Sequence, residues 1–159
     1  MLPSKTEARA ALRAALEIEL GSVERVAAMA RDEASSAETR QEGKYDTRAT
    51  EASYLARGQA ERVASLRRLR AWFDLPESRR EDPSGVAIGS LVILLQGQQR
   101  TMALVVPTGG LRASIDALPV LGISPRAPLG AAMLGLEAGD AFEVRTPGGV
   151  QVWEVEAVV

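Results

Sequence analysis

The segment SSAETRQEGKYDTR, residues 35–48, separates two long stretches of helical periodicity and contains a single glycine, Gly43. In the first stretch apolar side chains recur at spacings of three, four or seven, at Leu12, Leu16, Val23, Val26 and Ala30. The second runs from about Asp46 to Phe73, with apolar positions at Ala49, Ala52, Ala56, Val63, Leu66 and Phe73. Two such helices joined by a short connection cover their apolar seams by packing on each other. The pattern therefore predicts an antiparallel coiled-coil hairpin whose tip is residues 35–48.

The beginning of the first helix has a recognisable signal. Ser4 and Glu7 form the Ser-x-x-Glu pattern of a capping box, in which each side chain accepts a hydrogen bond from a free backbone amide of the first turn. At the other end of the connection, Asp46 suits the N-cap of the second helix. The hairpin is thus predicted to have defined ends.

The composition excludes several classes of function. The chain has 159 residues, of which 46% are hydrophobic, so it can bury a core. It contains no cysteine and no histidine, which removes thiol nucleophiles, disulfides and histidine-based sites and leaves carboxylates as the candidate catalytic groups. The net charge of −2 does not indicate general binding to nucleic acid. With no signal peptide or apolar span, we expect a cytoplasmic protein with no membrane contact.

The second half of the chain has a different sequence pattern. Strand-like runs separated by glycine and proline occur at 86–88, 91–95, 102–106, 142–145 and 150–158. Pro128 to Leu134 is predicted to form a short helix that stops at Gly135, and Phe142 and Trp153 are expected in the core of the sheet. The fold class is therefore α+β. We predict a hairpin over residues 1–74, a linker over 75–84 and an antiparallel sheet domain over 85–159.

The order of signals in this second half is specific. Ile123-Ser124-Pro125 precedes the run from Pro128 to Gly135, and Gly139-Asp140, Pro147-Gly148-Gly149 and an alternating strand follow. This order resembles the C-terminal domain of the Gre (GreA/GreB) family of bacterial transcript cleavage and transcription elongation factors. In that family an FKBP-like C-terminal domain follows an N-terminal antiparallel coiled coil. The resemblance extends over nearly the whole chain.

The resemblance implies a partner and a role. The C-terminal domain is expected to dock on core RNA polymerase at the rim of its secondary channel, while the hairpin reaches toward the active site and its acidic tip shares the magnesium of the polymerase. The chain would be a monomer, no enzyme of its own, and would meet nucleic acid only through the elongation complex. The resemblance implies partner-binding residues at Ser124, Pro125, Pro128, Leu129, Gly130 and Gly135.

The tip departs from the family pattern, which is Asp-x-x-Glu-Asn-x-Glu-Tyr. When Tyr45 is aligned with the tyrosine, Glu38 takes the place of the first acid and Gln41 that of the second. Glu42 then replaces the asparagine, and Lys44 replaces the last glutamate. The resemblance makes Glu38 and Glu42 the expected magnesium ligands, with Gln41 and Tyr45 in support. Because only one acid of the main pair is in place, weak cleavage is expected.

Three other interpretations remain open. The chain enters the channel as a regulator or inhibitor that does not cleave, or it is a protein-interaction module whose hairpin dimerises. A prolyl isomerase is a further alternative, although that activity requires an apolar pocket lined by aromatic residues. Only Phe142 and Trp153 are aromatic beyond the linker.

Overall fold

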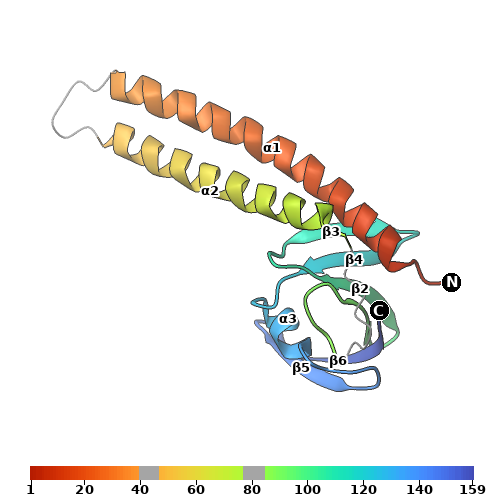
Figure 1. The fold of residues 1–159 in the computed structure, drawn as a ribbon. Helices are drawn as coiled ribbons and strands as arrows, with labels where there is room; N and C mark the ends of the chain where they lie inside the picture. Colours follow the sequence, from red (N-terminus) through yellow and green to blue (C-terminus); the bar gives the residue numbers. More distant parts are fainter. Residues whose placement is uncertain (40–46, 77–84) are drawn as a thin grey trace. The chain divides into compact units, whose positions relative to one another are not determined.

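The computed structural model describes residues 1–39, 47–76 and 85–159. Two long helices come first, α1 (Lys5–Thr39) and α2 (Arg48–Asp74), and the strands follow with one short helix among them (Figure 1). The remaining elements are β1 (Leu91–Gln96), β2 (Gln99–Val105), β3 (Leu111–Ile115), β4 (Leu118–Ile123), α3 (Pro128–Met133), β5 (Ala141–Thr146) and β6 (Gly149–Val158). The predicted α+β class, with a helical hairpin before a sheet that carries a short helix, is confirmed.

The chain forms two compact units. One consists of Met1–Ala15 together with Phe73–Val159, and the other of Leu16–Trp72. Each unit groups residues that contact one another, whatever their order in the chain. The first turns of α1 therefore belong to the unit that contains the sheet. The predicted boundaries at residues 74 and 85 stay a prediction.

The capping box at the start of α1 is present. The Ser4 backbone N–H donates to Glu7 Oε2 at 2.7 Å, and the Glu7 N–H donates to Ser4 Oγ at 3.2 Å. The Ser4 hydroxyl also donates to Glu7 Oε2 at 2.7 Å. These hydrogen bonds favour the charged carboxylate and lower the pKa of Glu7, the Ser4 backbone contributing most.

The apolar seam of the hairpin differs from the predicted one at one position. Leu16, Ala30, Val63 and Leu66 are buried as expected, but Val26 is 46% exposed and Ala27 takes its place in the seam. Val26 and Ala27 each lie three or four residues from both Val23 and Ala30. The heptad spacing alone therefore fits either residue as the buried position. Ala27 lines one surface hollow together with Ala60, Val63 and Ala64 of α2.

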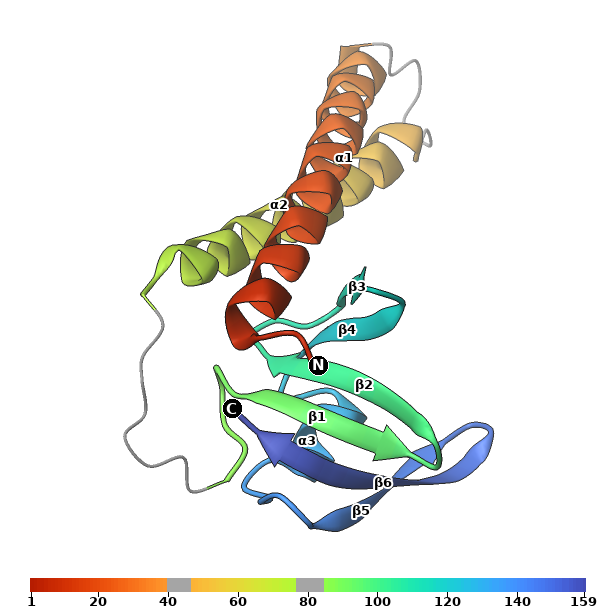
Figure 2. The same ribbon diagram turned by 90° about the vertical axis from the view of Figure 1, so that its right-hand side faces the viewer.

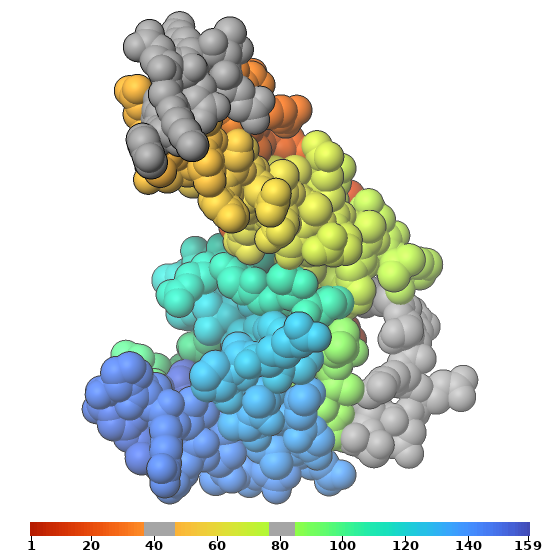
Figure 3. Space-filling view, turned by 90° about the vertical axis from the view of Figure 1, so that its left-hand side faces the viewer, coloured from red at the N-terminus to blue at the C-terminus, as the bar shows by residue number. Residues whose placement is uncertain are grey.

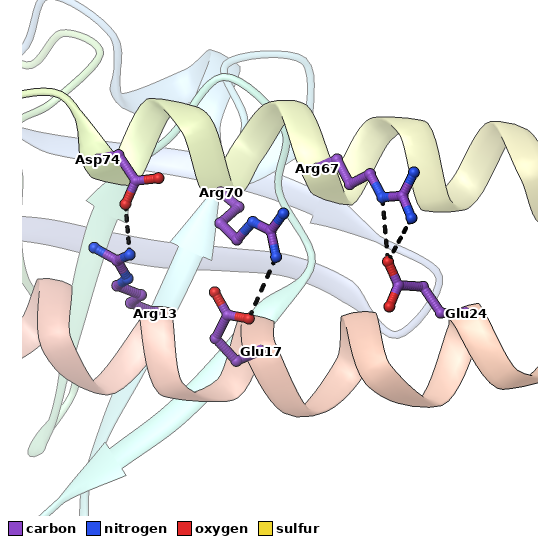
Figure 4. Close-up of polar contacts among 6 residues, drawn as sticks. All are labelled: Arg13, Glu17, Glu24, Arg67, Arg70 and Asp74. Carbon is purple, nitrogen blue, oxygen red and sulfur yellow. Dashed lines mark hydrogen bonds and ion pairs between the residues drawn. The ribbon is translucent and has the colours of Figure 1, made fainter.

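Ion pairs connect the two helices along the hairpin (Figure 4). Within Leu16–Trp72, Arg67 contacts Glu24 at 2.8 Å and Arg70 contacts Glu17 at 3.7 Å. Within the other unit, Arg13 contacts Asp74 at 2.5 Å. Residue numbers rise along α1 as they fall along α2, which is the antiparallel arrangement. Pairs this exposed contribute about 0–1 kcal/mol each, so they define the register more than the stability.

The sheet has six strands in the order β3-β4-β2-β1-β6-β5 (Figure 2). It is mixed rather than wholly antiparallel as predicted, because β2 and β4 pair in parallel, with Met102 opposite Val120. After β2 the chain passes to the edge of the sheet to form β3, and the β3–β4 hairpin then brings β4 back beside β2. The predicted strand at 86–88 is absent, although the Val86 N–H donates to Leu136 O at 2.8 Å.

Alternation along the strands buries both faces of the central sheet. On one face a core forms beneath α3 from Val92, Leu94, Ala103, Val105, Ile123, Met133 and Val155. The intervening residues Leu91, Ile93, Met102 and Leu104 point to the other face and are also buried. Ala8 and Leu12 of α1 are fully buried in the same compact unit. The second face of the sheet and the start of α1 are therefore both buried within one unit.

None of the helices in the described part of the chain has the length and apolar character needed to cross a membrane.

Candidate functional site

A recess of about 560 Å³ opens on the α3 side of the sheet, where β3, β4, the start of α3 and the β5–β6 hairpin meet. Figure 3 shows the surfaces of β4 and α3 next to that of the β5–β6 hairpin on the face turned to the viewer. The lining residues are Gly109, Gly110, Leu111, Arg112, Leu121, Gly122, Ile123, Ser124, Arg126, Ala127, Pro128, Leu129, Val144, Thr146, Gln151 and Trp153.

The turn between β4 and α3 positions one wall of the recess. Ser124 Oγ accepts a hydrogen bond from the Arg126 N–H at 3.1 Å, and Ser124 O accepts one from the Ala127 N–H at 3.0 Å. Pro128 follows at the first helical position, where its fixed φ suits a helix start and its missing N–H costs nothing. The turn therefore fixes the direction in which Pro128 and Leu129 are presented.

Gly130 allows α3 to lie directly on this turn. A Cβ at position 130 would overlap the backbone oxygen of Ser124 and meet Ile123 Cγ2 at 3.0 Å. No other residue fits this close approach without moving the helix. The recess therefore depends on a glycine beneath it.

The walls of the recess are apolar, with Leu121, Ile123, Leu129 and Val144 among them. Trp153 on β6 also lines it, and its indole Nε1 is buried without a hydrogen-bond partner in the described part of the chain. Such donors are rare, because an unpaired buried N–H costs about 1–3 kcal/mol. The site combines a hydrophobic surface with one unsatisfied donor.

The charged side chains of the recess are both cationic. Arg112 and Arg126 line it and are exposed, and no aspartate or glutamate is among the lining residues. Within the described residues neither guanidinium has a hydrogen-bond or ion-pair partner. The recess is thus suited to bind an apolar group with negative charge nearby.

Of the predicted partner-binding residues, Ser124, Pro128 and Leu129 line the recess. Pro125 lies in the same turn and Gly130 is buried beneath it. Gly135 follows α3 with φ of +77° and donates its N–H to Val86 O at 2.8 Å, so it shapes the end of the helix. Their role in binding stays a prediction.

Sequence reasoning missed Arg112, Arg126 and Val144, and it placed Trp153 in the core alone. Trp153 does pack against the core, as Phe142 does, but it also lines the recess. The alternation of β6 was the available signal, since Gln151, Trp153 and Val155 share one face. Arg112 lies on a strand that was not predicted, so nothing indicated its position.

The tip can be followed only in part. Glu38 lies near the end of α1, whereas Gln41, Glu42, Tyr45 and Asp46 lie outside the described residues. Among the residues that the structure describes, no group of three or more acidic side chains is placed to hold a metal ion. The predicted magnesium ligands, Glu38 and Glu42, therefore stay a prediction.

Comparisons with known proteins give one family. Residues 81–159 match the family described as transcription elongation factor, GreA/GreB, C-terminal. Among solved structures, GreA factor homolog 1 (Gfh1) of Thermus thermophilus is 22% identical with a TM-score of 0.39, covering 92% of this chain and 94% of that chain. GreA/GreB from Nitrosomonas europaea is 23% identical with a TM-score of 0.38, covering 82% and 93%. No curated protein gives a match.

Proposed function

Because this chain belongs, through its C-terminal domain, to the GreA/GreB family of transcription elongation factors, we propose that it binds core RNA polymerase. The recess is the proposed docking site, and the hairpin is proposed to enter the secondary channel. The observation that supports this most is that three residues expected to contact the partner, Ser124, Pro128 and Leu129, line one apolar recess. Recesses with apolar walls and few polar groups are common binding sites.

At the tip, we propose that Glu38 and Glu42 approach the magnesium of the polymerase. Their carboxylate oxygens are the donors that this hard ion prefers. When bound, the ion supplies Lewis-acid activation of water for phosphodiester hydrolysis. The chain would act as a cofactor of cleavage by the polymerase and not as an enzyme itself.

The sequence of the tip favours modulation over strong cleavage. Gln41 brings no negative charge to the position where the family has its second acid, and Lys44 brings a positive charge. Changing even a residue that only supports the ligands of a metal typically costs about 10–100-fold in metal affinity or activity, so the loss of an acid at the tip is expected to matter. We therefore propose a channel-binding regulator that stimulates RNA cleavage weakly.

The test uses purified core polymerase in backtracked complexes. The wild-type chain should co-elute with the polymerase and give weak cleavage, and the Gln41→Glu/Lys44→Glu double variant should cleave about 10-fold faster at equal binding. Glu38→Ala in the double variant should remove the gain.

Two results would contradict the proposal. Absence of polymerase binding at low salt would remove the function as a whole. Strong wild-type cleavage that is lost in Glu38→Ala or Glu42→Ala would show that the tip is already competent.

A further inference from the structure

The positive charge around the recess stands out against the rest of its domain. Residues 85–159 contain four basic side chains and six acidic ones, for a net charge of 4 − 6 = −2. Two of the four basic residues, Arg112 and Arg126, line the recess, and none of the six acids does. Charge of one sign is therefore concentrated at the apolar opening of a domain that is negative overall.

Both guanidinium groups are available to a partner. Arg112 is on β3, an edge strand of the sheet, and Arg126 is in the turn before α3, so the two approach the recess from different elements. Arg100, in contrast, is held by Glu156 through hydrogen bonds of 2.8 and 2.6 Å. Arg112 and Arg126 have no such carboxylate among the described residues.

We propose that the recess binds an apolar side chain flanked by carboxylates on an acidic segment of RNA polymerase. This inference rests on the proposed function and specifies the chemistry of the partner surface. The apolar side chain would contact Leu121, Leu129 and Trp153, while the carboxylates pair with Arg112 and Arg126. Arginine suits this role because its planar fork binds a carboxylate through two parallel hydrogen bonds.

A phosphate group would also satisfy the arginines, but it does not suit the walls. Besides the two arginines, the lining includes leucine, isoleucine, valine and tryptophan side chains, with Ser124, Thr146 and Gln151 as its uncharged polar side chains. A phosphodiester would pair with the arginines, but it has no apolar side chain to cover the leucine and tryptophan walls, which would stay in contact with water. A protein segment with an apolar anchor satisfies both parts of the site, and nucleic acid becomes an outcome of the test.

The experiment measures the affinity of the full chain for core RNA polymerase between about 50 and 300 mM salt. Arg112→Glu/Arg126→Glu should weaken binding about 10-fold at low salt and flatten the salt dependence, because charges at the rim of an interface act mainly through long-range attraction. Arg145→Glu is the matched control, since Arg145 is an exposed arginine of the same domain that does not line the recess. It should change affinity less than about twofold.

A second pair of variants examines the apolar part. Leu129→Ala should weaken binding at every salt concentration, whereas Leu134→Ala, which alters an exposed leucine outside the recess, should not. Unfolding midpoints equal to that of the wild type show that each variant is folded.

The outcomes separate the two proposals. If the wild type does not bind polymerase, the proposed function fails and this inference with it. Leu129→Ala could weaken binding while the double arginine variant behaves like Arg145→Glu. In that case the recess does bind the polymerase, but the inference that the bound segment is acidic is wrong. If single-stranded RNA competes with polymerase for the wild type but not for the double variant, the site binds phosphate and the inference is overturned.

Discussion

Gly130 shows how one residue determines whether the recess exists. It lies inside α3, where alanine is normally the more stable residue by about 1 kcal/mol. Here the added Cβ would overlap the Ser124 backbone oxygen, which belongs to the turn that forms the recess wall. Steric overlap and helix propensity therefore act in opposite directions at this position.

We expect overlap to dominate, so that Gly130→Ala lowers the free energy of unfolding by about 1–3 kcal/mol. The measurement is urea unfolding followed by circular dichroism. Gly148→Ala is the control, because its Cβ would meet Thr146 Oγ1 at an ordinary 3.8 Å and φ there is not positive. A Gly130→Ala protein as stable as the wild type would show that α3 moves freely on its turn.

At the scale of elements, the hairpin and β1, β2, β5 and β6 could be predicted because their periodicity is local. The β3–β4 hairpin could not, since its turn is Asp116-Ala117, with φ of 48° and 67°. Turns with two positive φ values usually carry Asn-Gly or Asp-Gly, and alanine gives no such signal. Pro119 within β4 further weakened the strand pattern.

The part of the site that depends on these strands was missed for the same reason. Leu129 and Ser124 were identified from the order of motifs along the chain, which needs no knowledge of pairing. Arg112 reaches the recess only because β3 pairs with β4. Long-range pairing of this kind leaves no trace in the spacing of neighbouring residues.

The capping box makes the start of α1 sensitive to pH. The pKa of Glu7 is lowered in the folded chain, so its carboxylate stabilises the fold at pH values above the ordinary 4.5, and this contribution is lost as the pH falls through the lowered value. Glu7→Gln should therefore flatten the fall in melting temperature below about pH 4.5.

Glu33→Gln on an exposed part of the same helix serves as the control and should keep the wild-type pH profile. Identical slopes for wild type and Glu7→Gln would show that the box does not contribute to folding.

At the scale of the whole molecule, α1 serves both compact units. Ala8, Leu12, Leu16 and Leu20 are all buried at spacings of four, and each such step advances about 40° around the helix. The buried stripe therefore changes face along α1. Ala8 and Leu12 belong to the unit that contains the sheet, and Leu16 and Leu20 to the unit that contains most of the hairpin.

Leu12→Ala should thus destabilise the sheet domain, although Leu12 is far from it in sequence. We expect a loss of about 2–5 kcal/mol, read from Trp153 fluorescence in a Trp72→Phe background. Val26→Ala changes a half-exposed position of the same helix and should cost less than about 0.5 kcal/mol. If the Trp153 transition is unchanged in Leu12→Ala, the first turns of α1 do not stabilise the sheet.

The place of β6 in the sheet has a consequence for biosynthesis. β6 lies between β1 and β5, and it pairs Val155 with Leu94, a residue made much earlier. While residues 149–158 are still inside the ribosome, β1 has one open edge and β5 has no neighbour at all. In a nascent chain the recess therefore lacks the wall that β6 supplies. A product interrupted before Gly149 exposes an unpaired strand of the kind that quality-control proteases and chaperones recognise.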